Sequence, residues 1–130
     1  MIESVSSDRI ASLLTFFLDV QSRRAQVVSS NVANVDTPGY RAKELDFSEQ
    51  LHRAASDAVT PGAANALLKA NADGLGVVEQ LGNATGIDGN TVDMEHEMAT
   101  LAQAGGQYMS GLQLLQSRLR TLRIAIREGR

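Results

Sequence analysis

An apolar repeat in the last third of the chain constrains the fold more than any other feature of the sequence. Between residues 91 and 128, apolar residues alternate steps of four and three over about four heptads, with a gap at Gly105. This pattern predicts a helix roughly 50 Å long. A rod of that length cannot bury its own apolar stripe, so it needs a helical partner. The repeat consists of Met94, Met98, Leu101, Gly105, Tyr108, Leu112, Leu115, Leu119, Leu122 and Ile126.

The charges of this segment follow the dipole expected of a helix. Acidic residues lie near its start, where Asn90, Thr91 or Asp93 is the expected N-cap, and Gly129 is expected to end it. The basic residues toward its end are Arg118, Arg120, Arg123 and Arg127. We interpret Arg118 and Arg123 as flanking the apolar repeat, where they pair with acidic residues of a neighbouring subunit.

A second helical pattern, over residues 7–34, offers a partner within the same chain. Its expected N-cap is Ser6, Ser7 or Asp8. Because this helix is shorter, part of the C-terminal apolar repeat should remain free for neighbouring subunits. Its apolar stripe consists of Ile10, Leu14, Phe17, Gln21, Ala25, Val28 and Val32.

The segment between the two helical patterns is less regular. Residues 37–40 predict a type II turn, with Pro38 at its second position and Gly39 at its third. A short amphipathic helix carrying Phe47, Leu51 and Ala54 should follow. The weakly apolar residues 75–78 either form a small hairpin or are mobile, and the sequence leaves both open.

These patterns predict a mainly α protein. The long N- and C-terminal helices should pack as a coiled-coil-like pair around a small irregular or partly β middle segment. We divide the chain into an N-terminal helix (residues 1–34), a turn and middle segment (35–90) and a C-terminal heptad helix (91–130). The two helices together should form one inner domain.

Composition argues against an enzyme. There is no Cys, no Gly-rich phosphate loop and no plausible pair of catalytic carboxylates. The acidic residues around His96 are explained by the helix dipole, and no second His stands at a metal-binding spacing. A net charge of −3 gives no indication of nucleic-acid binding. We therefore expect no catalytic, cofactor or metal site.

Membrane insertion and ordinary secretion are not predicted either. The apolar run at residues 13–18 is too short to span a bilayer. The first eight residues lack the basic start and apolar core of a cleaved secretory signal. If the chain leaves the cytoplasm, we expect another export route.

One short element resembles a known family. Residues 31–40 read Asn-Val-Ala-Asn-Val-Asp-Thr-Pro-Gly-Tyr and match the Ala-Asn-x-x-Thr-Pro-Gly-Tyr element of flagellar rod, hook and hook-filament proteins. The residues of this turn motif are Asn31, Asn34, Thr37, Pro38, Gly39 and Tyr40. We expect it to fix the angle between the first helix and the middle segment, with Asn34 in a left-handed conformation and its amide bonded to free carbonyls.

Two further stretches narrow the resemblance to the proximal rod proteins of the flagellar basal body. One is residues 40–47, directly after the turn, and the other is a helix-start motif that opens the C-terminal helix. The residues of the helix-start motif are Asp88, Gly89, Asn90, Val92 and Glu97.

The resemblance implies a structural subunit that polymerises in the periplasm, exported without a cleaved signal by the flagellar type III apparatus. Its implied partners are other rod subunits, the inner-membrane ring with its junction protein, and the export apparatus. Polymerised subunits would transmit torque and enclose the export channel. The implied assembly seam on the C-terminal helix is Met98, Leu101, Tyr108, Leu112, Leu115, Leu119, Leu122 and Ile126.

The chain departs from the family pattern in two places, and a rival function remains. Residues 69–75 lack a His that relatives often carry, and Gly105 and Gly106 stand together before Tyr108. These two glycines mark a close-packing point, a hinge or a position without a role. The rival function is a soluble coiled-coil adaptor or export chaperone, which has no evident need for the turn motif.

Overall fold

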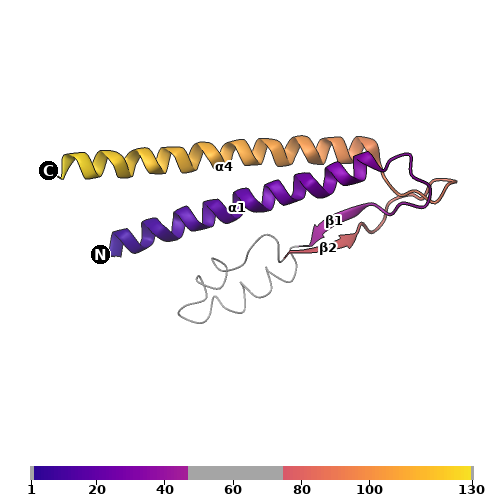
Figure 1. The fold of residues 1–130 in the computed structure, drawn as a ribbon, viewed down its shortest axis with the longest axis horizontal. Helices are drawn as coiled ribbons and strands as arrows, with labels where there is room; N and C mark the ends of the chain where they lie inside the picture. The colour runs from indigo at the N-terminus through magenta and orange to yellow at the C-terminus, as the bar shows by residue number, and fades with distance from the viewer. Residues whose placement is uncertain (1, 47–74, 130) are drawn as a thin grey trace.

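The fold is a long antiparallel helical hairpin with a small β-ribbon beside it (Figure 1). The computed structural model describes residues 2–46 and 75–129. Helix α1 (Ile2–Ala33) and helix α4 (Met94–Glu128) pack along one another. Strands β1 (Lys43–Asp46) and β2 (Gly76–Glu79) lie on the side of α1 away from α4. The predicted mainly α fold, with paired terminal helices and a partly β middle, is confirmed.

The first helix begins earlier than predicted. It starts at Ile2, so Ser6, Ser7 and Asp8 lie inside it and the prediction that one of them is the N-cap was wrong. Cap-forming residues cost only a few tenths of a kcal/mol in a helix interior, so they do not prevent an earlier start.

The hydrophobic core lies between α1 and the β-ribbon. It consists of Val20 and Val27 from α1, Leu45 from β1 and Leu75 just before β2, with Phe16 packed against them. The expected stripe of α1 contains the buried residues Gln21 and Val28 but omits Val20 and Val27. Helix α1 therefore buries two faces, because it packs against α4 and against the ribbon (Figure 1).

The sequence left open whether residues 75–78 form a small hairpin or are mobile, and the structure shows that they contain a strand. Residues 76–79 form β2, which pairs antiparallel with β1, so that Lys43 lies opposite Glu79 and Asp46 opposite Gly76. The strand thus pairs with a segment before residue 47 and not with a neighbour in a local hairpin. The expected helix with Phe47, Leu51 and Ala54 lies outside the described residues.

The surface of α4 that contacts α1 is displaced by one residue from the predicted repeat. Glu97, Ala104 and Gly111 are buried at seven-residue spacing, each one position before Met98, Gly105 and Leu112 of the repeat. At Gly111 the helices approach closely, since an added Cβ would lie 3.0 Å from Phe17 Cδ1 and 3.1 Å from Leu18 Cδ2. Small residues on α4 therefore give the hairpin its close contact.

Both ends of α4 lie where the sequence predicted. The Asp93 side chain is the N-cap and accepts hydrogen bonds from the backbone N–H of Glu95 and His96, at 3.0 and 3.2 Å. At the other end the Gly129 N–H donates to the Ala125 carbonyl at 3.1 Å.

Gly105 and Gly106 are not a close-packing point. A Cβ built on either residue meets no atom within 4 Å, and α4 runs through both without a break. The close-packing reading of this pair was therefore wrong, and the contact is made at Gly111 instead.

We therefore expect Gly105→Ala to raise the free energy of unfolding by about 1 kcal/mol, because alanine replaces glycine in a helix interior without a clash. Urea denaturation followed by circular dichroism measures the change. Gly111→Ala is the control: its Cβ would meet Phe17, which offsets the gain in helix propensity. An equal gain at both positions would contradict this account of the interface.

Candidate functional site

The two sequence motifs meet at the closed end of the hairpin. The turn motif follows α1 and the helix-start motif precedes α4, so chain segments about fifty residues apart lie in direct contact. We call this contact region the motif junction, formed by residues 31–43 and 80–97.

The turn itself has the predicted geometry. The Tyr40 N–H donates to the Thr37 carbonyl at 3.2 Å, and Gly39 has a φ of +72°, as the third position of a type II turn requires. The Asn34 amide donates to the Ser30 carbonyl at 2.8 Å, as expected. The expected left-handed conformation of Asn34 was wrong, since no described residue other than glycine has a positive φ.

Asn31 ties the end of α1 to the start of β1. Its side chain is fully buried, donates to the Lys43 carbonyl at 2.7 Å and accepts from the Lys43 N–H at 2.9 Å. The Tyr40 hydroxyl also donates to Asn31 Oδ1, at 3.3 Å. A carboxamide is suited to this position because it offers a donor and an acceptor side by side, as a backbone peptide does.

Asn90, in the helix-start motif, also forms hydrogen bonds to the end of α1. Its Nδ2 lies 2.9 Å from each of the carbonyl oxygens of Asn34, Val35 and Thr37. Since the amide has two hydrogens, one of them is shared. Its Oδ1 accepts from the Val92 N–H at 2.7 Å. Asn90 thus caps the turn that follows α1, as a donor supplied from a distant segment.

Backbone contacts complete the junction. The Gly39 N–H donates to the Asp88 carbonyl at 2.9 Å, and the Thr91 N–H donates to the Tyr40 carbonyl at 3.0 Å. Gly89 has a φ of +82°, and a Cβ on it would lie 3.5 Å from Gly39 Cα. The glycines of the two motifs therefore lie against each other, and the positive φ of each explains why both motifs contain one.

The junction also contains a buried carboxylate. Glu97 is fully buried, and its Oε1 accepts a hydrogen bond from Gln80 Nε2 at 2.9 Å. Its second oxygen, Oε2, has no hydrogen-bond partner. Gln80 is in turn held by Asn83, whose Nδ2 lies 2.6 Å from Gln80 Oε1. The Ala42 N–H donates to Thr91 Oγ1 at 2.9 Å.

We expect Glu97→Gln to raise the free energy of unfolding at pH 7 by about 1 kcal/mol. Glutamine keeps the size and the acceptor oxygen but removes a buried charge that lacks a full set of partners. Chemical denaturation of the two proteins measures the difference. Glu95→Gln, at an exposed position of the same helix turn, should change stability by no more than a few tenths of a kcal/mol. A loss of stability in Glu97→Gln would show that the charge itself is needed.

Sequence reasoning found much of this site but missed part of it. Asn31, Asn34, Asn90 and Glu97 were selected from the motifs, and the junction brings them together. Gln80 and Asn83 were not selected, because isolated amides in an irregular segment carry no pattern. His96 does not gather with the acidic residues around it: within residues 2–46 and 75–129, no group of three or more His, Asp or Glu side chains is arranged to hold a metal ion.

The predicted assembly seam lies largely on the outside of the hairpin. Within α4, Leu101, Leu112 and Leu115 are half-buried at the edge of the contact with α1. The other members of the seam are exposed: Met98, Tyr108, Leu119, Leu122 and Ile126.

Comparison with known proteins agrees with the resemblance indicated by the turn motif. A family model described as "Flagella basal body rod protein" matches residues 18–41, which include the turn motif. The flagellar basal body rod protein FlgB of Aeromonas hydrophila is 33% identical over 129 residues, covering 95% of this chain and 97% of that protein. The chain belongs to the FlgB family of flagellar basal body rod proteins.

Other FlgB proteins are similar over the same extent. That of Salmonella typhimurium is 28% identical over 94% of this chain and 98% of its own length, and that of Escherichia coli is also 28% identical over 94% of this chain. FlgB proteins are structural components of the basal body rod by name, which agrees with the structural role read from the motifs. In the described part of this FlgB-family chain, neither helix has a stretch long and apolar enough to cross a membrane.

Proposed function

We propose that this chain polymerises through its terminal helices into the axial rod of the flagellar basal body, where the assembled subunits transmit torque and enclose the export channel. The observation that carries the proposal is the uncovered apolar seam of α4. Leu119 is 50% exposed and Ile126 is 73% exposed, although the hairpin is closed at the motif junction. An apolar stripe left outside a completed contact is typical of a surface that other chains cover.

The motif junction supplies the stiffness that such a subunit needs. Asn31 and Asn90 connect the end of α1 to segments on either side of it, so the hairpin is fixed at one end by the hydrogen bonds of two buried asparagines. A fixed angle between the helices lets each subunit present its seam in the same way. We propose that Asn31, Asn34, Thr37, Pro38, Gly39 and Tyr40, together with Asp88, Gly89, Asn90, Val92 and Glu97, serve this purpose.

The proposed partners follow from the same role. They are other rod subunits along the seam, the inner-membrane ring with its junction protein at the base, and the export apparatus during delivery. We propose a periplasmic location reached through the flagellar type III route. No cofactor or catalytic step enters this proposal.

Isolation of detergent-resistant basal bodies from the source organism tests the proposal. After the hook and filament are stripped away, an antibody to this chain should detect it in an amount stoichiometric with the rod. Recovery only in the soluble fraction of motile cells would reject the structural role. It would favour the soluble adaptor or export chaperone instead.

A further inference from the structure

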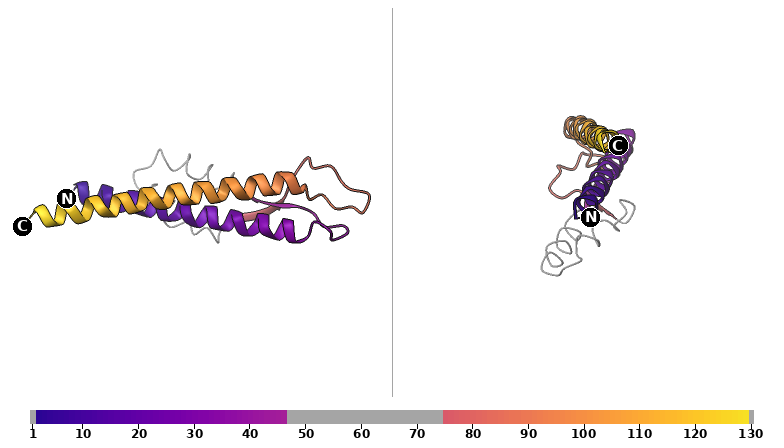
Figure 2. Two further views of the ribbon diagram at one scale, coloured as in Figure 1. Left: turned by 90° about the horizontal axis from the view of Figure 1, so that it is seen from above. Right: turned by 90° about the vertical axis from the view of Figure 1, so that its left-hand side faces the viewer.

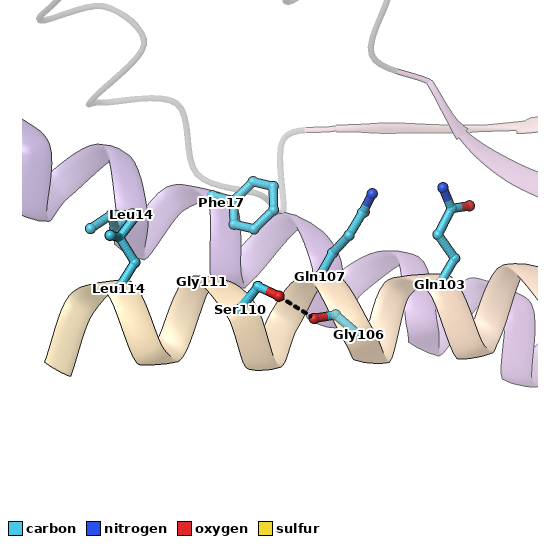
Figure 3. A pocket seen from close by; sticks show the side chains of 8 residues that line it. All are labelled: Leu14, Phe17, Gln103, Gly106, Gln107, Ser110, Gly111 and Leu114. Carbon is cyan, nitrogen blue, oxygen red and sulfur yellow. Dashed lines mark hydrogen bonds between the residues drawn. The ribbon is translucent and has the colours of Figure 1, made fainter. Parts of the chain in front are cut away.

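A shallow apolar groove lies along the hairpin where α1 and α4 meet (Figure 3). Its volume is about 580 Å³. Leu14 and Leu114 line one end, Phe17 lies over Gly111 in the middle, and Gln103 and Gln107 lie at the other end. The groove is open because Gly106 and Gly111 bring no side chain to α4 at these positions. Nothing in the described part of the chain fills it.

The loop between β2 and α4 carries an isolated apolar side chain that is exposed to solvent. Ile87 is fully exposed, with a relative accessibility of 112%. It occupies a turn closed by a hydrogen bond of 2.9 Å from the Gly89 N–H to the Gly86 carbonyl. A second bond, from the Gly86 N–H to the Asn90 carbonyl at 2.8 Å, ties this turn to the motif junction. The loop therefore presents Ile87 as a fixed apolar projection.

The groove and the projection cannot meet within one molecule. From Asp93 at the start of α4 to Ser110 in the groove is 17 residues, or roughly 25 Å of helix. The hairpin is held straight between them by the α1–α4 contact (Figure 2). Contact between the two features therefore requires two chains.

The charges around the two features are complementary. Ile87 is followed by Asp88, Asp93 and Glu95, which are all exposed. Residues 98–117 of α4, which contain the α4 side of the groove, carry no charge, and Arg118 and Arg120 follow directly. An apolar centre with an acidic edge on one surface and a basic edge on the other is the arrangement expected of two surfaces that bind each other.

We propose that Ile87 of one copy of this chain inserts into the groove at Gly106 and Gly111 of a second copy. The contact joins two different surfaces of the same chain, so it is heterologous and can repeat from copy to copy. This inference rests on the proposed function, to which it adds the surfaces that neighbouring subunits use and their axial offset. It is separate from the seam, which occupies the other edge of the α1–α4 contact.

Cysteine cross-linking tests the contact, because the chain contains no native Cys. Ile87→Cys and Ser110→Cys are produced from two differently tagged copies in the same cells, and basal bodies are isolated under mild oxidation. A disulfide-linked species carrying both tags is expected. Met109→Cys is the matched control, because it is exposed and adjacent to Ser110 but does not line the groove. Its yield with Ile87→Cys should be about tenfold lower.

Filling the groove provides a second test. Gly106→Leu adds a side chain where an added Cβ meets no atom within 4 Å, so helix content and thermal stability should be kept. Incorporation into basal bodies should fall by about tenfold, since the groove can no longer admit Ile87. Ala102→Leu adds the same side chain at an exposed position outside the groove and should be incorporated normally.

The results of these experiments distinguish a failure of the groove contact from a failure of the proposed function. A Gly106→Leu chain incorporated as well as wild type would overturn the groove contact. Cross-links from Ile87→Cys to another rod component only, or to Met109→Cys as readily as to Ser110→Cys, would also overturn it. In each of these cases the chain is found in the rod, so the proposed function stands. Absence of the wild-type chain from basal bodies would remove the proposed function as well.

Discussion

Asn90→Ala should lower the free energy of unfolding by about 3 kcal/mol, the largest effect on stability that we expect from a single truncation in this chain. The substitution removes the donor that lies 2.9 Å from each of three carbonyl oxygens at the end of α1. It also removes the acceptor of the Val92 N–H. The Asn34 and Thr37 carbonyls keep backbone donors, the N–H groups of Thr37 and Tyr40, so the loss comes mainly from the Val35 carbonyl and the Val92 N–H. Polar groups left without a partner cost about 1–3 kcal/mol each. Thermal and urea denaturation, followed by circular dichroism, measure the loss.

Asn34→Ala is the matched control for this prediction. Its amide makes one local bond to the Ser30 carbonyl and accepts one from the Thr37 hydroxyl, both in the exposed part of the turn. Its truncation should cost about 1 kcal/mol or less. Equal losses for the two variants would mean that Asn90 does not hold the junction, and that the two motifs are stable independently.

Leu119→Asp should abolish rod assembly and motility while leaving the isolated hairpin folded. Leu119 is 50% exposed, so an aspartate there stays in water in the free subunit. In an assembled rod the same charge would be buried in the seam, at a cost of several kcal/mol. Motility in soft agar and basal-body preparations give the assembly result, and circular dichroism of the purified chain gives the folding result.

Two further variants serve as comparisons for Leu119→Asp. Leu112→Asp, at a half-buried position beside α1, should reduce both folding and assembly. Gln113→Asp, at an exposed position outside the seam, should affect neither. Normal rods in cells that carry Leu119→Asp would exclude the exposed seam as the assembly surface.

The parts of the fold that the sequence predicted are those with a repeating pattern. The apolar repeat of α4 and the stripe of α1 were strong enough to give two paired helices. Gly129 and Asp93, one of three candidate N-caps, lie at the ends of α4. The turn at residues 37–40 was predictable because Pro38 and Gly39 each have a narrow range of backbone conformations. Local chemistry was sufficient in each case.

The displacement of the α1–α4 contact was not predictable from the same pattern. A search for apolar residues favours Met98 and Leu112, whereas the buried positions are Glu97, Ala104 and Gly111. Two of these are small and one is charged, so they carry no hydrophobic signal. They are buried because small residues let α1 approach and because Gln80 bonds to the Glu97 carboxylate.

The motif junction was predictable only in part, for a related reason. The two motifs identify their own residues, but nothing in either one indicates that Asn90 bonds to the turn after α1, more than fifty residues earlier. Side-chain bonds across such a separation leave no periodicity. The β-ribbon was also hard to predict from the sequence. Strands of four residues, such as Lys43–Asp46 and Gly76–Glu79, are too short to show a clear alternation of apolar and polar residues.

The distant cap on the turn after α1 also determines when this chain can fold. The Val35 carbonyl receives the Asn90 amide as donor only after Asn90 has been synthesised, a separation of 55 residues. At the usual translation rate of about 5–20 residues per second, Asn90 is synthesised several seconds after the end of α1. Loop closure over that length costs additional entropy, and contacts of high sequence separation slow folding. The hairpin should therefore close only after the segment that contains Asn90 has been synthesised.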